Sequence, residues 1–407
     1  MKEGTMSHNP SKLLSAICCL AVLALAGCSG DTIYQTSGCP VVPSAAPAAP
    51  AAVTCNNSAL TSYDELLIIG PHPDDEVLGF AGLAQEFKRL GKPVRIVVVT
   101  IGDAYCDACS FWKNVGVEPS MAKWAQCNEA DLKVFAEQVR RNETLSAQQV
   151  LGGPTPVFWD YPDTGLGTAW TAINTNIGVN TKLRRTDCTK SAVFGTGSET
   201  NLTPQGLYNQ LYTLIATASP RTLIGTTHPL DGHPDHTGLG NLVRKVNAEL
   251  AAKNDPNVRP KSVAFTVIHA NTTPAGYPDH DAWYPYPGAV DGRCIDPVKQ
   301  PCYLGDTTLL TRLRDWRYRP EWSFPLPGDI DYVSSIPGAV AVPFCLKAAD
   351  YQGPTALKLQ AVEKFISQQG YLARTGTIPA GMAGLVDCNG YQKGFIRSNE
   401  MFILEPL

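Results

Sequence analysis

Apolar residues along this chain form short continuous runs separated by stretches with helical spacing. Residues 63–70 end in an apolar run of the kind that forms a buried parallel strand. Apolar side chains then recur at helical spacing over 76–90, and Gly91 and Pro93 end that helix. A second apolar run at 94–100 predicts the next strand. Strand, helix and strand in this order predict a βαβ unit.

The same pattern recurs later in the chain. Residues 221–227 read as a strand, a polar loop follows, and a helix is expected over about 237–252. We therefore expect an α/β fold: a Rossmann-like, doubly wound, mainly parallel sheet with helices on both faces, plus insertions. Two segments fall outside a minimal core of this kind. Residues 164–206 are rich in Thr, Asn and Gly, and residues 271–345 are rich in Pro, Tyr and Trp.

A polar cluster follows the first strand and precedes the first helix. His72, Asp74 and Asp75 lie there, at the carboxyl end of a parallel strand, where α/β sheets place their ligand sites. Imidazole and carboxylate suit a divalent metal, and His72 and Asp75 can face one ion across a tight turn. Asp74 would then lie beside the metal's water as general base. The alternative is an acidic helix N-cap, although a cap requires a single Asp.

A second cluster, His228–His236, holds three of the seven histidines and follows the strand at 221–227. A catalytic zinc takes about three protein ligands and keeps one position open. We expect His236 as the third ligand. His233, with Asp235 as its carboxylate neighbour, has the pattern of an oxyanion stabiliser or proton donor. His228 and Asp231 either support these residues or belong only to the loop. A low-affinity metal patch is the alternative for the whole cluster.

These two motifs resemble those of the LmbE-like/PIG-L family of zinc-dependent de-N-acetylases. The family's first motif is similar to His72–Glu76 and its second to Gly232–His236. The resemblance covers most of residues 60 to 405, interrupted by insertions. Weaker similarity lies in Arg140, Glu143, Ala147, Leu151–Gly152 and Phe158–Asp163, and towards the end in Lys358, Ala361–Val362, Ser367–Gln368 and Glu400–Phe402.

The resemblance implies a zinc-dependent N-deacetylase, a hydrolase acting on the linear amides of N-acetylglucosamine-containing glycans or glycoconjugates. It implies one Zn²⁺ per chain, with Arg140 and Asp163 contacting the sugar; Arg141 competes with Arg140 if the register shifts by one. The other roles it implies agree with those inferred from the residues: ligands His72, Asp75 and His236, base Asp74, and His233 tuned by Asp235. The alternatives are an exported amidase or deacylase on a non-sugar amide, and a non-catalytic surface carbohydrate-binding protein.

The amino terminus indicates export. A hydrophobic stretch over 13–26 follows Lys2 and Lys12 and is short for a membrane span. It ends in Leu25–Cys28, which resembles a bacterial lipobox with Cys28 as the lipidated residue; a plain secretion signal is the alternative. We expect a signal peptide over 1–27, an Ala/Pro-rich tether over 28–57 and a deacetylase domain over 58–407. Ser29 resembles outer-membrane sorting, so the protein would face the periplasm or cell surface, held to the membrane by its lipid.

Cysteine usage and charge agree with export. Of thirteen cysteines, Cys18 and Cys19 fall in the signal and Cys28 carries the lipid, which leaves ten for disulfides. The expected pairs are Cys294–Cys302 and Cys345–Cys388, with Cys106, Cys109 and Cys127 stapling a segment after the second strand; a redox or zinc role for Cys106 and Cys109 is the alternative. The formal net charge is −4 without a basic patch, so no nucleic-acid partner is expected.

Overall fold

The computed structural model describes residues 55–104, 109, 113, 127–186, 192–194, 202–253, 255, 259–268, 332–351, 355–365 and 399–406. These residues belong to one compact unit, Pro50–Leu407; a second unit, Met1–Ala49, lies outside the described residues. The signal peptide, Cys28, the expected pair Cys294–Cys302 and most of the Trp- and Tyr-rich segment also lie outside them.

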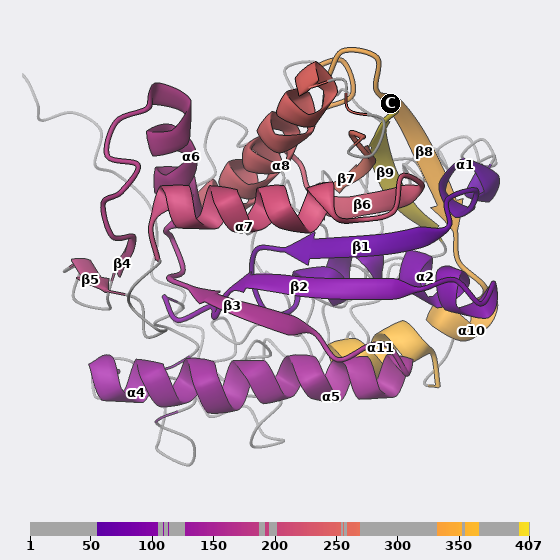
Figure 1. The fold of residues 1–407 in the computed structure, drawn as a ribbon. Helices are drawn as coiled ribbons and strands as arrows, with labels where there is room; N and C mark the ends of the chain where they lie inside the picture. The colour runs from indigo at the N-terminus through magenta and orange to yellow at the C-terminus, as the bar shows by residue number, and fades with distance from the viewer. Residues whose placement is uncertain are drawn as a thin grey trace, which may run out of the picture. The chain divides into compact units, whose positions relative to one another are not determined.

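A seven-stranded sheet forms the centre of the unit, in the order β3-β2-β1-β6-β7-β9-β8 (Figure 1). All neighbouring pairs from β3 to β7 are parallel, while β9 runs antiparallel to both β7 and β8. The expected α/β fold with a mainly parallel sheet is confirmed. The strands are β1 (Glu65–Gly70), β2 (Val94–Thr100), β3 (Val157–Tyr161), β6 (Thr222–Thr227), β7 (Ser262–Thr266), β8 (Val340–Cys345) and β9 (Asn399–Glu405); β4 (Arg184–Thr186) and β5 (Ala192–Phe194) form a separate hairpin.

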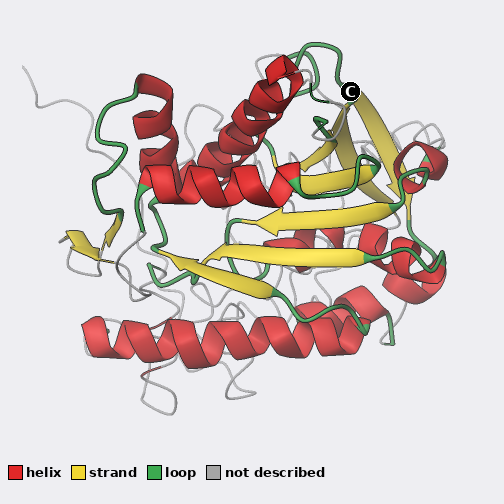
Figure 2. Cartoon of the chain, in the orientation of Figure 1, coloured by secondary structure: helices red, strands yellow, loops and turns green. Residues whose placement is uncertain are grey.

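Helices cover both faces of the sheet (Figure 2). The side chains of β1 alternate: Leu66 and Ile68 pack with α2, whereas Leu67 and Ile69 share a core with α7 and α8. Both faces are therefore buried, which explains the continuous apolar run of β1. The helices are α1 (Asn57–Thr61), α2 (Asp75–Arg89), α4 (Glu129–Val134), the π-helix η2 (Phe135–Arg140), α5 (Arg141–Leu151), α6 (Leu166–Thr175), α7 (Pro204–Ala216), α8 (Pro234–Lys253), α10 (Ala348–Tyr351) and α11 (Leu357–Val362).

The strand order reverses direction at β1, which pairs with β2 on one side and with β6 on the other. The carboxyl ends of β1 and β6 therefore lie side by side, and the loops that leave them diverge to opposite faces. Ligand sites of open α/β sheets form at such a switch point. Both histidine clusters of the sequence follow these two strands, so the topology brings them together.

The second long helix begins earlier than its apolar spacing predicts. α8 starts at Pro234, not at Thr237, because proline at the first helical position has its backbone angle preset and needs no hydrogen-bond partner. Asp235 and His236 consequently lie in the first turn of the helix, and not at the end of the loop. Their side chains are held by a regular element.

Segment 164–206 contributes to the main core. Leu166, Ala169 and Ile173 of α6 are buried with Leu183 and Leu202 in the cluster that also holds α7 and α8. The region set apart on composition therefore packs against the sheet's own helices over its described part.

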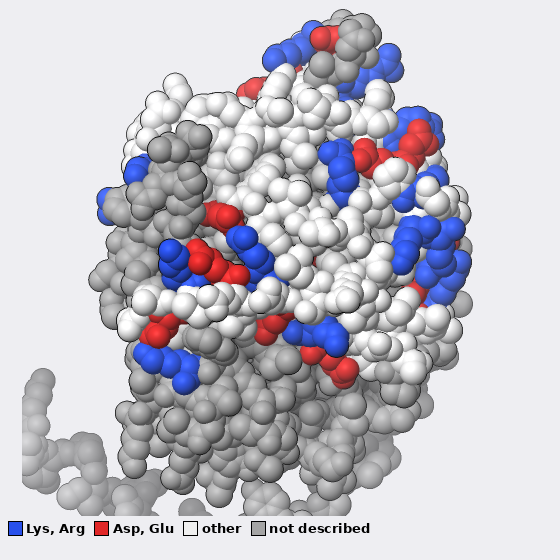
Figure 3. Space-filling model, turned by 60° about the horizontal axis from the view of Figure 1, so that its bottom comes forward, with Lys and Arg blue, Asp and Glu red and all other residues white. Residues whose placement is uncertain are grey.

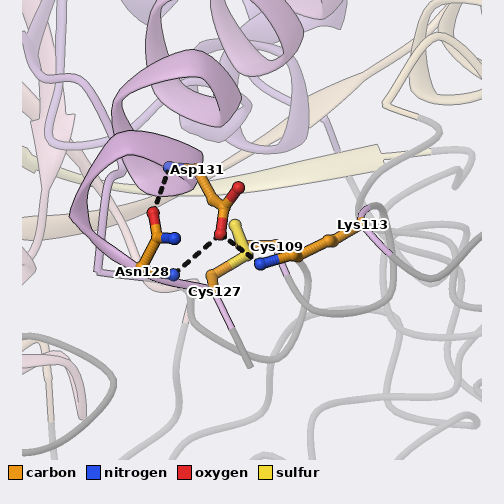
Figure 4. The surroundings of a disulfide bond; sticks show 5 residues. All are labelled: Cys109, Lys113, Cys127, Asn128 and Asp131. Atoms are coloured by element: carbon orange, nitrogen blue, oxygen red, sulfur yellow. Dashed lines mark hydrogen bonds and ion pairs between the residues drawn. A yellow bond between two sulfur atoms is a disulfide. The ribbon is translucent and has the colours of Figure 1, made fainter. Parts of the chain in front are cut away.

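Two disulfides tie loops to this core. Cys109 is bonded to Cys127 beside the capping box of α4 formed by Asn128 and Asp131 (Figure 4), which confirms these two members of the expected staple after β2, while Cys106 lies outside the described residues. Cys345, however, is bonded to Cys55, so the expected pairing with Cys388 is wrong.

The reason for the Cys55–Cys345 pairing is that β8 lies beside the start of the unit. The Asn57 side chain exchanges two hydrogen bonds with the backbone of Cys345, accepting at 2.8 Å and donating at 2.9 Å. The Cα atoms of the bonded cysteines are consequently 5.6 Å apart, within disulfide range. Residues 55–57, which composition places in the tether, thus belong to the folded unit.

A buried ion pair clamps α2 from the far end of the chain. The Lys358 ammonium lies 2.6 Å from the Glu400 carboxylate and donates to the carbonyl of Leu78, while the carboxylate accepts the N–H groups of Gly82 and Leu83. Both charged side chains are almost fully buried. Residues of α11 and β9 thus bond three backbone groups in the middle of α2.

The described surface carries charges of both signs. On the face in Figure 3, lysine and arginine lie next to aspartate and glutamate, with wide uncharged areas between the groups. Among the described residues, no helix combines the length and apolar composition needed to cross a bilayer.

Candidate metal centre

Loops from the carboxyl ends of several strands bring the expected site residues into one buried cluster. His72, Asp74 and Asp75 come from the turn between β1 and α2, while His233, Asp235 and His236 come from the loop and first turn that follow β6. Asp163 follows β3, and Arg140 is the last residue of η2. All eight are connected to another member through contacts shorter than 4 Å.

Three donor atoms form a nearly equilateral triangle. His72 Nδ1 lies 3.1 Å from His236 Nε2 and 3.2 Å from Asp75 Oδ2, and the last two atoms are 3.3 Å apart. Tetrahedral zinc with bonds of about 2.0–2.1 Å requires ligand atoms about 3.3–3.4 Å from one another. The triangle therefore has the dimensions of one face of a zinc tetrahedron, whose fourth corner is left for water or substrate.

Two other groups of possible ligands share His72. They are His72 with His233 and His236, and His72 with Asp163 and Asp235. In the second group, Asp163 and Asp235 lie 3.2 and 3.3 Å from His72 Nε2, the nitrogen that faces away from the triangle. Both carboxylates also accept backbone N–H groups, from Ala104 for Asp163 and from Thr164 and Leu166 for Asp235. Their contacts are those of carboxylates that orient a ligand histidine.

The electrostatics of the cluster favour a bound cation. Burial lowers the pKa of His236, but the carboxylates of Asp75 and Asp231 outweigh it and raise that pKa to about 10. Burial raises the pKa of Asp163, but the positive charge of His72 and its hydrogen bond hold that pKa below its usual range. Such a concentration of carboxylates around two imidazoles attracts positive charge, which a divalent metal supplies.

Asp74 differs from an ordinary helix N-cap. It occupies the N-cap position of α2, yet its side chain accepts no capping hydrogen bond from the described backbone. Its φ of 146° is strained for a residue with a side chain, as is frequent at functional sites. Burial raises the pKa of Asp74 to about 6, against the opposing charge of Arg140, whose Nη2 lies 3.6 Å from the carboxylate. A carboxylate with a pKa close to neutrality suits a general base.

Of the two neighbouring arginines, Arg140 reaches the cluster and Arg141 does not. The wider turn of η2 directs Arg140 into the cluster, where its guanidinium donates to the carbonyls of Pro73 and Gly102 at 3.0 and 3.1 Å. Arg141 instead pairs with Asp160. Arg140 is only 4% exposed, and its described contacts hold the Asp74 turn. Its expected contact with a sugar, like that of Asp163, stays a prediction.

His233 and Asp235 are arranged differently from the expected pair. The backbone N–H of Asp235 donates to Nδ1 of His233 at 3.2 Å, which leaves Nε2 as the donor of the neutral ring. In its described contacts the Asp235 carboxylate faces His72 and two backbone N–H groups, so it orients His72, the expected ligand. His233 is half-buried, whereas His72 and His236 are buried.

Sequence reasoning left three contributing residues open or missed them. Asp231 Oδ1 lies 3.3 Å from Nδ1 of His236, and its carboxylate also accepts two backbone N–H groups. His228 accepts the N–H of Leu230 and contacts a backbone carbonyl, which makes it a neutral loop anchor. Asp103 accepts the N–H of Asp163. The signal for Asp103 was its place just after β2, at the same sheet edge.

A comparison with protein families gives one match. Residues 67–247 match the family described as "PIG-L: GlcNAc-PI de-N-acetylase". No curated protein matches the chain.

Solved structures with similar folds include two deacetylases and a hydratase. The N,N'-diacetylchitobiose deacetylase from Pyrococcus horikoshii is 17% identical with a TM-score of 0.33, and the alignment covers 53% of this chain and 64% of that one. A deacetylase of teicoplanin biosynthesis is 16% identical, with coverages of 84% and 97% and a TM-score of 0.39. The 4-carboxy-2-hydroxymuconate hydratase from Pseudomonas putida is 15% identical, with coverages of 66% and 93% and a TM-score of 0.34. The chain thus spans less than two thirds of the archaeal enzyme, and these likenesses carry no information about substrate.

Proposed function

Because residues 67–247 carry a domain of the PIG-L family, which supports a hydrolase of the deacetylase class, we propose that the protein is a zinc-dependent N-deacetylase. Its proposed substrates are N-acetylglucosamine-containing glycans or glycoconjugates. The observation that supports this best is the triangle of His72, Asp75 and His236 donors beside Asp74, a buried carboxylate at the start of α2. A site that only stiffened the fold would need no base next to an open ligand position.

The roles of the residues follow from their contacts. Zinc held by the three donors would supply Lewis acidity and lower the pKa of a bound water to about 7. Asp74 accepts the proton of the attacking water, and Arg140 fixes the turn that carries this carboxylate. His233 presents Nε2–H, which can stabilise the oxyanion of the tetrahedral intermediate. Asp74 then passes the proton that it took from the water to the leaving amine. Acetate and the free amino sugar are the products.

The test compares Asp74→Asn with Asp64→Asn in the full-length protein. Asp64 is an exposed aspartate that pairs with Arg221, so its substitution controls for loss of a surface charge. We expect one zinc in both variants, and acetate release from N-acetylglucosamine oligomers that is about 10²–10⁴-fold slower in Asp74→Asn only. Asp75→Asn should lose the metal.

Three results would contradict this proposal in different ways. Full activity in Asp74→Asn would remove that residue as the base. Zinc binding without acetate release from any acetylated sugar would point to a non-sugar amide. Absence of bound metal would leave a carbohydrate-binding protein as the better interpretation.

We also propose that the protein is an exported lipoprotein anchored through Cys28, exposed to the periplasm or cell surface. The two disulfides of the folded unit support an oxidising compartment, since such bonds rarely persist in the cytosol. Cys28→Ala should move the protein from the membrane fraction to the soluble fraction. An unchanged membrane fraction would contradict the lipid anchor.

A further inference from the structure

A cavity of about 720 Å³ opens beside the metal centre, and we name it the threonine groove. It lies along α6, which packs on α8 (Figure 1). All of its lining residues except Pro234 lie in the segment over 164–206, which contains neither of the two histidine motifs. Its lining consists of Thr164, Gly167, Thr168, Thr171, Ala172, Thr175, Ile177, Gly178, Thr181, Lys182, Leu183, Pro204 and Pro234.

One end of the groove is formed by residues next to the metal centre. Thr164 follows Asp163 in the chain, and its backbone N–H donates to the Asp235 carboxylate at 2.7 Å. Pro234 lies between His233 and Asp235. Gly167 fits so closely against Pro234 that a Cβ there would lie 3.1 Å from the proline carbonyl oxygen. One end of the groove is thus built from the neighbours of three site residues.

Threonines line one side of the groove at helical spacing. Thr168, Thr171 and Thr175 recur every three or four residues and therefore share one face of α6, while Thr164 precedes the helix. The hydroxyls of Thr171 and Thr175 donate to carbonyls one turn earlier, at 3.0 and 2.8 Å. Their oxygens keep lone pairs that can accept hydrogen bonds from a ligand's hydroxyl groups.

Apart from Lys182, the rest of the lining is apolar or uncharged. Ile177, at the far end, is 74% exposed, which is unusual for a large aliphatic side chain. Among the described residues that line the groove, Lys182 alone carries a charge. A ligand that matches this surface has many hydroxyls, apolar faces and little charge, which is the chemistry of neutral sugar rings.

We propose that the threonine groove binds the distal sugar rings of an oligomeric, neutral glycan whose acetamide lies at the metal centre. This inference rests on the proposed deacetylase function and narrows its substrate from any acetylated sugar to a chain of sugars. From Gly167 to Thr175 the helix extends about 12 Å, longer than one sugar ring. Binding energy from such remote rings raises turnover when it positions the reacting group.

The first test measures acetate release from N-acetylglucosamine and from its tetramer. In the wild type, kcat/KM should be at least about tenfold higher for the tetramer. Thr171→Tyr, which fills the groove from α6, should bring the ratio of tetramer to monosaccharide close to one. Asn174→Tyr is the matched control, because Asn174 is an exposed residue of the same helix outside the lining, and it should keep the wild-type ratio.

A second test measures binding without turnover. In the Asp74→Asn background, calorimetry with the acetylated tetramer should show tighter binding than with the monosaccharide, and adding Thr171→Tyr should weaken tetramer binding about tenfold. Turnover without dependence on chain length would contradict the proposed role of the groove but not the proposed deacetylase function. Groove-dependent binding without turnover in the wild type would overturn the deacetylase and keep the groove. Absence of both would overturn the two together.

Discussion

Gly102 offers the sharpest test of how Arg140 supports the site. This glycine has a φ of +65°, and a Cβ at its position would lie 2.1 Å from Nη1 of Arg140. Gly102→Ala therefore perturbs the chain in two ways: it strains the backbone, and it displaces the guanidinium. Gly91→Ala separates the two effects, since Gly91 has a similar φ of +69° and no heavy atom within 4 Å of the added carbon.

The two substitutions should differ by the contacts of Arg140. An alanine in the left-handed region costs roughly 1–2 kcal/mol, and this applies to both glycines. Only Gly102→Ala also disturbs two buried hydrogen bonds from the guanidinium to the carbonyls of Pro73 and Gly102, each worth about 1.5–3 kcal/mol for a charged donor. We expect Gly102→Ala to be at least about 3 kcal/mol less stable than Gly91→Ala.

The assay is urea unfolding of both variants, with zinc content and acetate release measured on the same preparations. A shift of about 1 Å in the turn that carries Asp74 can reduce turnover about 10²-fold, so Gly102→Ala should keep its zinc but lose activity. Gly91→Ala should keep both. Equal stabilities of the two variants, together with full activity of Gly102→Ala, would refute the view that Arg140 holds this turn.

Three further predictions concern the scaffold. Burial lowers the pKa of His228 to about 4 from an ordinary 6.5, so the contribution of the neutral ring to stability, about 3 kcal/mol, is complete above pH 6.5 and is lost as the pH falls towards 4. His228→Gln should flatten this part of the curve of unfolding free energy against pH. An unchanged slope would contradict the role of His228 as a buried neutral group. Lys358→Met should destabilise the protein by about 3–5 kcal/mol in urea unfolding, because Glu400 keeps a buried charge without its ammonium partner; a loss under about 1 kcal/mol would show that the pair is dispensable. Replacing Cys109 and Cys127 by serine should cost about 3 kcal/mol in urea unfolding for a loop of 18 residues, and a reductant should destabilise the wild type by more, because it also opens the Cys55–Cys345 bond.

The sequence predicted the sheet well wherever local patterns determine structure. The apolar runs of β1, β2 and β6 lie within a residue or two of the observed strands, because both faces of these strands are buried. The two histidine loops were expected to act together because each follows a strand and offers metal-ligand residues, and the strand order of the structure brings them side by side. By contrast, the start of α8 was placed late, because the polar residues that open this helix carry no apolar period.

Contacts between segments distant in sequence were harder to predict. The Cys55–Cys345 bond joins residues 290 apart, and nothing local indicates that β8 lies beside the start of the unit. The Asp235 carboxylate was expected to tune His233, which is two residues away, whereas it contacts His72, which is 163 residues away. The choice of Arg140 over Arg141 depended on a π-helical turn that spacing rules do not anticipate.

The clamp on α2 ties the folding of this helix to the far end of the chain. Asp75 opens the helix, yet the carboxylate that accepts the N–H of Gly82 lies 318 residues beyond that glycine. The contacts of Glu400 with α2 can form only when β9 has reached the sheet, where it pairs with β7 and β8. The native surroundings of α2 are therefore completed by a long-range contact and not by the sequence of the helix itself.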